Sequence, residues 1–165
     1  IVFFLMNVLN MEFDTPYNSA PFSNIKITDF LPAFKTALAE SKKNIAAIIS
    51  NPEPPNFKNT VEALEFSSLR LDRISSLFFN LNAAETNDAI QKIAQEVSPL
   101  LTAFSNDVAL NKSLFDRLKI VYNRLENLNL TTEQKTLLEK KYKGFVRNGA
   151  NLNPNDKTRL RKQLF

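Results

Sequence analysis

The sequence of 165 residues contains neither histidine nor cysteine. Their absence removes imidazole bases, Ser-His and Cys-His nucleophile pairs, the common zinc ligands, disulfides and thiol redox chemistry. Only carboxylate, carbonyl and water oxygens are left as metal ligands. We therefore predict no catalytic and no metal-binding residue in this stretch. The substrate-binding residues are left unassigned by the sequence.

Glycine is almost as scarce, with two residues, Gly144 and Gly149, and tryptophan is absent. So few glycines disfavour the hairpin turns of a β-rich fold and the phosphate loop of a nucleotide site. What the chain does contain is 14 phenylalanines and 44% hydrophobic residues. A chain of this length buries about 70% of its unfolded surface. We therefore predict an all-α fold with a core of Phe and Leu.

Positive charge is concentrated near the C-terminal end. Residues 130–165 carry nine Lys/Arg against three Asp/Glu, whereas residues 1–129 carry twelve against fourteen. A basic end can bind nucleic acid or an anionic membrane. No aromatic–basic interleaving and no known reader motif accompanies it, so we expect neither partner. A solvated helix face, or one that meets an acidic partner, explains the charge.

The chain opens on a run of six apolar residues, Ile1–Met6. The run is too short to span a membrane. It can be the tail of a signal-peptide core or a remnant of cloning, and both alternatives stay open. We expect a cytoplasmic location, with export to the periplasm as the alternative.

Residues 1–27 are predicted to be an extended N-terminal segment, because Thr15-Pro16 and Ala20-Pro21 disfavour helix. Residues 28–165 are predicted to form a helical domain of five or six helices. Thr28 is the expected N-cap of a helix over 29–50, which ends at the proline-rich loop 51–56.

A second helix is expected to start at a capping box of Asn59 and Glu62 and to run past Leu81 with a wide apolar stripe. Pro99 should kink or end the third helix, and Gly149 suits the C′ position of the fifth. The sequence stops inside the sixth predicted helix, so we expect the domain to be truncated there. The remaining predicted helix starts are Thr86 or Asn87, Asn111, Thr131 with Gln134, and Asn153-Pro154.

Few residue pairs match known chemistry. Ser23-x-x-Lys26 fits the nucleophile motif of penicillin-binding enzymes, but its partner motifs are missing. Glu62 and Glu65, like Glu139 and Tyr142, lie one helical turn apart. Because Glu62 lies near a predicted helix start, a helix cap explains it more simply than acid–base catalysis does.

Other patterns also have structural explanations. Asp72 and Arg73 are adjacent and project in different directions, so they are expected to be surface charges or to have separate partners. The N-glycosylation sequons that start at Asn111 and Asn129 consist of residue types that are also common at helix starts and in loops. The pair Phe78-Phe79 can line an apolar channel or receive a partner helix, although core packing is the simpler prediction.

Several segments resemble the front of bacterial peptidyl-dipeptidases, in the thimet oligopeptidase and oligopeptidase A family of zinc metallopeptidases. The resemblance runs from about Leu9 to Phe165, and its most specific part is the proline-rich loop. Ala20 departs from it, because such enzymes often have a second proline there. The segments that carry it are Phe13–Phe22, Ile25-Lys26, Phe30–Phe34, Asn51–Leu64, Phe78–Leu81 and Glu85–Asp88.

The resemblance implies an almost wholly helical fold, in which two halves flank a deep channel for short peptides. The family's zinc site, an H-E-x-x-H helix with a further Glu downstream, has no counterpart here, so no catalytic residue carries over. The resemblance implies that this stretch forms part of the channel wall or lid. The expected partners are the missing catalytic half and, in the whole enzyme, an oligopeptide and zinc.

Two functions follow as hypotheses. The first is the N-terminal helical domain of a zinc-dependent peptidyl-dipeptidase, inactive alone. The alternative is a self-standing helical protein-interaction module. We also expect self-association through apolar faces, namely the second helix, Leu164-Phe165 and the run Ile1–Met6.

Overall fold

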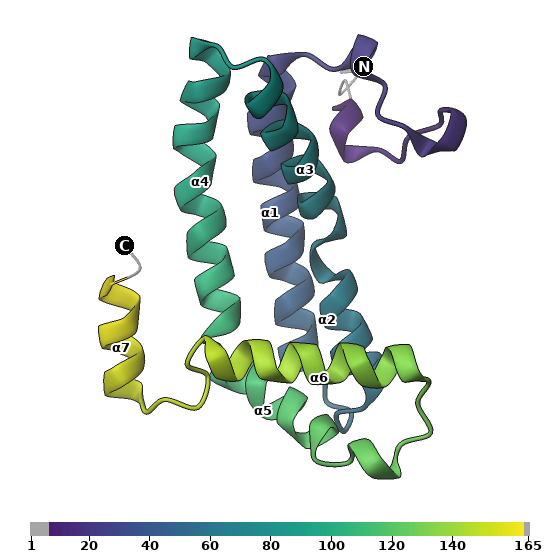
Figure 1. Ribbon diagram of the computed structural model, residues 1–165, viewed down its shortest axis with the longest axis vertical. Helices are drawn as coiled ribbons and strands as arrows, with labels where there is room; N and C mark the ends of the chain where they lie inside the picture. Colours follow the sequence, from purple (N-terminus) through teal and green to yellow (C-terminus); the bar gives the residue numbers. More distant parts are fainter. Residues whose placement is uncertain (1–6, 164–165) are drawn as a thin grey trace. The chain divides into compact units, whose positions relative to one another are not determined.

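The computed structural model describes residues 7–163, and these form helices and loops without a strand. Six α-helices have ten residues or more, and α2 is a single short turn (Figure 1). The predicted all-α fold is confirmed. The helices are α1 (Ile27–Ser50), α2 (Ala63–Glu65), α3 (Leu69–Ala84), α4 (Asp88–Ala109), α5 (Lys112–Tyr122), α6 (Thr132–Arg147) and α7 (Pro154–Gln163).

The chain packs as two compact units, and α1 and α4 each contribute residues to both. Of the described residues, the first unit comprises 7–42 and 68–102, and the second comprises 43–67 and 103–163. The sequence predicts a different division, into an extended segment 1–27 and a helical domain 28–165. The two packed units do not test that division, which stays a prediction.

An aromatic cluster forms the core of the first unit. Phe78 on α3 is fully buried, and its ring centroid lies 5.2 Å from that of Phe30 and 5.4 Å from that of Phe34, both on α1. In Figure 1, α1 and α3 run side by side. Ala33 and Ala37 on α1 are also fully buried. The predicted core role of Phe78 is confirmed.

The second unit has its own core, built from α5, α6 and the end of α1. Its fully buried side chains include Leu114 and Leu118 on α5 and Leu138 on α6, and the rings of Phe115 and Phe145 stack with centroids 6.1 Å apart. Aliphatic packing and stacked rings of this kind typically supply most of the stabilisation of a small helical unit.

The second predicted helix is not continuous. Its first turns are a π-helical segment, Phe57–Glu62, followed by α2 and a 3₁₀ turn, Phe66–Ser68, before α3 begins. At the break the Ser67 hydroxyl donates to Leu64 O at 2.7 Å, and Asn44 Nδ2 donates to Ser67 O at 3.0 Å. At this break, serine and asparagine side chains thus satisfy backbone carbonyl groups outside the regular helical ladder.

This break divides the wide apolar stripe. Leu64, Leu71 and Ile74 are buried, whereas Phe66 and Leu69 are more than half exposed. The predicted wide apolar stripe is therefore only partly buried. The predicted capping box is also displaced: Asn56, not Asn59, is the N-cap, and Asn59 is its partner at N3.

Most of the other predicted helix ends are confirmed. Asn87 Oδ1 accepts from Ile90 N, Asn111 Oδ1 accepts from Leu114 N, and Thr131 forms a capping box with Gln134. Gly149 adopts φ +86° beyond α6, and the bonds Gly149 N to Val146 O and Ala150 N to Phe145 O complete a Schellman motif.

The predicted cap at Thr28 is wrong. α1 begins at Ile27, so Thr28 lies inside it, and the helix start is stabilised by Asp29 Oδ2, which accepts from Lys26 N at 2.8 Å. Pro99 does not end α4, which continues to Ala109, and the alternative of a kink at Pro99 stays a prediction. The predictions for Ile1–Met6 and Leu164-Phe165 lie outside the described residues.

Candidate functional site

The residue pairs that match known chemistry in the sequence are not assembled into reactive groups. Ser23 and Lys26 are both exposed, and the Ser23 hydroxyl donates to Asn24 Oδ1 rather than to Lys26. Glu65 forms a salt bridge at 2.6 Å with Lys141 of α6, which joins α2 to α6. Among the described residues, no partnered base therefore faces a nucleophile at either place. The Glu62 side chain makes no cap hydrogen bond, so its predicted role as a helix cap is wrong.

Glu139 and Tyr142 also have separate partners. Glu139 Oε2 accepts from Lys143 Nζ at 2.7 Å, and this hydrogen bond and the carboxylate's charge raise the pKa of Lys143. Tyr142 stacks face to face on Tyr122, with centroids 3.9 Å and planes 4° apart, and its ring also stacks on Phe115. Both residues therefore stabilise α6 and its contact with α5.

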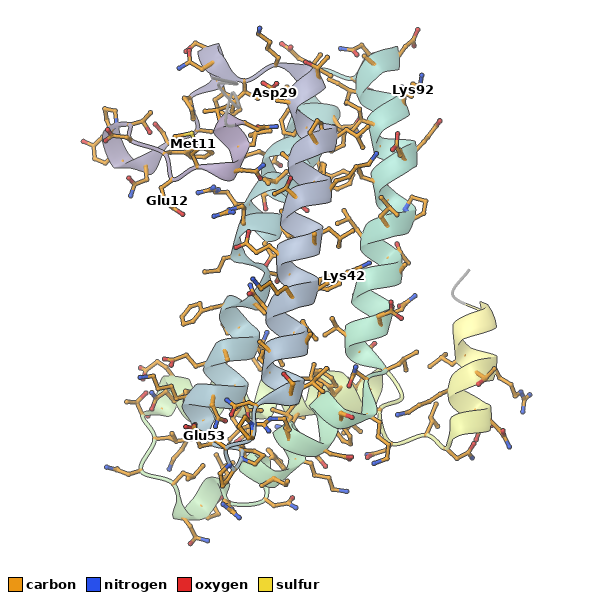
Figure 2. The ribbon with its side chains drawn as sticks, turned by 180° about the vertical axis from the view of Figure 1, so that it is seen from behind. Met11, Glu12, Asp29, Lys42, Glu53 and Lys92 are labelled. Atoms are coloured by element: carbon orange, nitrogen blue, oxygen red, sulfur yellow. The ribbon has the colours of Figure 1, made fainter. Side chains whose placement is uncertain are left out.

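The two adjacent charges on α3 have separate partners, as predicted. Asp72 Oδ2 accepts from the Ser68 hydroxyl. The guanidinium of Arg73 donates to Leu9 O at 3.2 Å and to Met11 O at 2.7 Å, and it lies 4.4 Å from the centre of the Phe13 ring. Arg73 thus anchors the N-terminal segment, in which Figure 2 labels Met11.

A second arginine holds the proline-rich loop. Arg117 of α5 donates from Nη1 to Asn51 O at 2.9 Å and from Nη2 to Glu53 O at 3.3 Å. Its Nε is buried without a hydrogen-bond partner. Both loop carbonyls thus gain a charged donor, which fixes the segment between α1 and the π-helical turn.

The sequon residues and the phenylalanine pair have structural roles or exposed positions. Asn111 caps α5, and Asn129 is an exposed residue shortly before Thr131, the N-cap of α6. Phe79 is about one-third exposed and packs edge-on against the buried Phe78.

Surface hollows in the second unit are the remaining candidates. A hollow of about 390 Å³ lies between α5 and the segment that joins α6 to α7; we call it the α5–α7 groove. Another hollow of about 300 Å³ lies beside the π-helical segment and is lined by Asn44, Asn59 and Phe66. Ligand pockets commonly start at about 300 Å³, so the α5–α7 groove is large enough for a small group.

Sequence reasoning missed the two arginine anchors and the α5–α7 groove. Lys112 and Lys119 lie seven residues apart on one face of α5, within residues 1–129, which carry no overall excess of basic residues. That spacing is a signal that could have found the groove. The arginine contacts join residues more than 60 positions apart, and no local pattern shows them.

The zinc that the resemblance implies for the whole enzyme does not fit the residues of this chain. It has no imidazole or thiolate, and within residues 7–163 no three acidic side chains come together to hold a metal ion. Within the same part of the chain, none of the helices combines the length and apolar character needed to cross a bilayer.

Comparison with known proteins shows similarity to bacterial peptidases. The chain is 38% identical to dipeptidyl carboxypeptidase of Escherichia coli over 94% of its length, and 38% identical to the Salmonella typhimurium protein of that name over 88%. It is 24% identical to oligopeptidase A of Salmonella typhimurium over 84% of its length. The matched part is 20–23% of each relative. No protein-family model matches the chain.

Proposed function

We propose that this chain, which is homologous to part of the bacterial dipeptidyl carboxypeptidases, forms a helical wall or lid of the substrate channel in a zinc-dependent peptidyl-dipeptidase. In this proposal the chain makes no chemical contribution of its own. The whole protein removes dipeptides from the C-termini of oligopeptides, and the zinc and its ligands belong to a part not present in this sequence. A cytoplasmic location belongs to the proposal, with export as the alternative.

The observation that carries the proposal is the coverage of the match. Almost the whole chain aligns, at 38% identity, with less than a quarter of the relative. A stretch that aligns so fully without histidine or cysteine corresponds to a part of the enzyme that supports, rather than performs, the chemistry. The partners of the described carboxylates agree with this role, because Glu65 and Glu139 each have a lysine partner.

The coding sequence that follows residue 165 tests the proposal most directly. An in-frame H-E-x-x-H motif with a downstream glutamate is the expected result, because it would supply two imidazole ligands and a base. A stop codon directly after Phe165 would overturn the proposal. It would favour the self-standing interaction module, for which the two units already have buried cores.

A biochemical test uses the 165-residue chain itself. We expect no cleavage of an internally quenched oligopeptide and no stoichiometric zinc site of sub-micromolar affinity by calorimetry, because oxygen ligands alone bind zinc weakly here. A tight zinc site, or peptide cleavage that a chelator abolishes, would contradict the proposal that this chain has a structural role and that the zinc chemistry belongs to another part of the protein.

A further inference from the structure

The α5–α7 groove combines an apolar floor with a basic rim. Phe115 on α5 and Ala150 after α6 form part of the floor and are almost completely buried. Leu152 stands beside them with 40% of its surface exposed. An exposed leucine next to a hollow gives a ligand side chain an apolar surface to cover.

The charges around the groove do not balance. Lys112 forms a salt bridge with Asp116 on the same helix, so this pair contributes no net charge. Lys119 on α5 and Lys157 on α7 also line the groove, and neither ammonium group makes a hydrogen bond or a salt bridge with a described residue. The described residues that line the groove therefore include three lysines against one aspartate, which leaves the groove with a net positive charge.

The turn between α6 and α7 gives the groove a defined wall. Gly149 adopts φ +86°, and a Cβ at this position would lie 2.8 Å from Leu152 Cδ1 and 3.0 Å from Leu160 Cδ2. The two leucines thus pack directly on the glycine backbone. The close packing of both leucines on this turn depends on a residue without a side chain at position 149.

We propose that the α5–α7 groove binds a short acidic segment of a separate peptide, which inserts a leucine or an aromatic side chain beside Leu152 and places carboxylates against Lys119 and Lys157. Recognition of acidic motifs by basic clusters is a recurrent mode of peptide binding. A volume of about 390 Å³ suits one or two side chains rather than a folded partner.

The same features argue against a nucleic acid in the groove. Single-stranded nucleic acids stack their bases on exposed aromatic faces and favour arginine. Here the lining aromatic residue, Phe115, is 3% exposed, and the cations that face the groove are lysines. This inference goes beyond the proposed function, because it assigns a ligand to the surface of this chain and holds whether or not the chain belongs to a peptidase.

A labelled peptide tests the inference. The probe is a fluorescein-labelled hexapeptide with a central leucine–phenylalanine pair and two aspartates on each side, and binding to the 165-residue chain is followed by fluorescence anisotropy. We expect saturable binding that weakens as salt is added. The double variant Lys119→Glu with Lys157→Glu should weaken binding about tenfold, because each reversal removes an attraction and adds a repulsion.

Two controls separate the groove from general charge effects. The double variant Lys42→Glu with Lys92→Glu makes the same charge change on exposed residues of α1 and α4 in the first unit (Figure 2), and should change affinity less than about twofold. A peptide with glycine and serine in place of its central pair should bind more weakly. Circular dichroism melting checks that each variant folds. If the groove double variant does not fold, the single variant Lys157→Glu replaces it in the binding measurement.

Several results would overturn the inference. They are the absence of saturable binding, equal weakening in both double variants, and indifference to the central apolar pair. Displacement of the peptide by a single-stranded DNA oligonucleotide at equal concentration would assign the groove to nucleic acid. A dimer in sedimentation velocity that disappears in the groove double variant would assign it to a second copy of the chain.

Discussion

Single residues decide how the first unit is held together, and Phe78 is the clearest of them. Its ring lies within 5.5 Å of three others, those of Phe30, Phe34 and Phe79, when ring centroids are compared. Edge-to-face pairs of this kind contribute about 0.5–1.5 kcal/mol beyond the area they bury. Phe79 is the next residue in the chain but is about one-third exposed.

Replacing the two phenylalanines by alanine should therefore have unequal effects. Phe78→Ala should lower the free energy of unfolding by about 3–5 kcal/mol, because it leaves a cavity among packed rings. Phe79→Ala should lower it by about 1 kcal/mol, because water already reaches its ring. Urea denaturation followed by circular dichroism measures both, and equal losses would show that the aromatic cluster does not form the core.

Arg117 supports a second residue-scale prediction. Arg117→Ala should cost about 1–3 kcal/mol, because the carbonyls of Asn51 and Glu53 lose their charged donor. It should also speed cleavage within residues 51–56 in limited proteolysis. Arg124→Ala, at an exposed arginine just after α5, is the matched control and should change neither property. Proteolysis of the loop at the wild-type rate would contradict the anchoring role.

At the scale of elements, the two glycines have opposite environments. Gly149 ends α6 with a positive φ, whereas a Cβ at Gly144, inside α6, would meet no atom within 4 Å beyond its own helix backbone and chain neighbours. Gly149→Ala should destabilise by about 1–2 kcal/mol, because alanine is strained at φ +86° and meets Leu152. Gly144→Ala should stabilise by about 0.5–1 kcal/mol. Thermal melting should give a lower melting temperature for Gly149→Ala and a higher one for Gly144→Ala. A shift in the same direction for both variants would contradict the requirement for glycine at the end of α6.

The start of α6 carries a pH-dependent contribution. Backbone N–H groups at the start of the helix and the Thr131 hydroxyl lower the pKa of Glu133 below its ordinary value of 4.5. A carboxylate whose folded pKa is lowered stabilises the fold above its unfolded pKa, and this contribution is lost as the pH falls through the folded pKa. An NMR titration should give a pKa below 4.5 for Glu133 and a higher one in Thr131→Ala. An unchanged pKa in that variant would contradict the cap.

Helix ends were predictable where their signals are local. Asn87, Asn111 and Thr131 each hydrogen-bond within three residues, so a short window of sequence contains the whole motif. The break before α3 was not predictable, because it depends on Asn44, 23 residues before its acceptor at Ser67. The contacts of Arg117 with the proline-rich loop were not predictable either, because they also join residues far apart in the sequence. The same holds for the groove, whose lysines come from α5 and α7.

At the scale of the whole molecule, several apolar side chains are left in water. Phe22, Phe66 and Leu69 are each more than half exposed, and Tyr17 is fully exposed. Single exposed apolar residues are ordinary, but aromatic ones are frequent where proteins meet other proteins. In the proposed enzyme, the rest of the protein would cover such residues.

We therefore expect the 165-residue chain to self-associate. Light scattering at several protein concentrations should show a rising apparent mass, and the double variant Phe66→Asp with Leu69→Asp should lower it, because exposed apolar area drives the contact. Lys42→Glu, at an exposed polar position, is the control and should leave it unchanged. A strictly monomeric chain at every concentration would favour the self-standing module.

The π-helical segment Phe57–Glu62 has a consequence for comparing this chain with its relatives. A π-helical turn accommodates one residue more than an α-helical turn. A relative that has one residue fewer between positions 57 and 62 can form an ordinary α-helical turn there and keep Val61 and Leu64 facing inward. A one-residue gap at this place in an alignment would therefore record a change of helical winding, with the flanking helices and the buried face conserved.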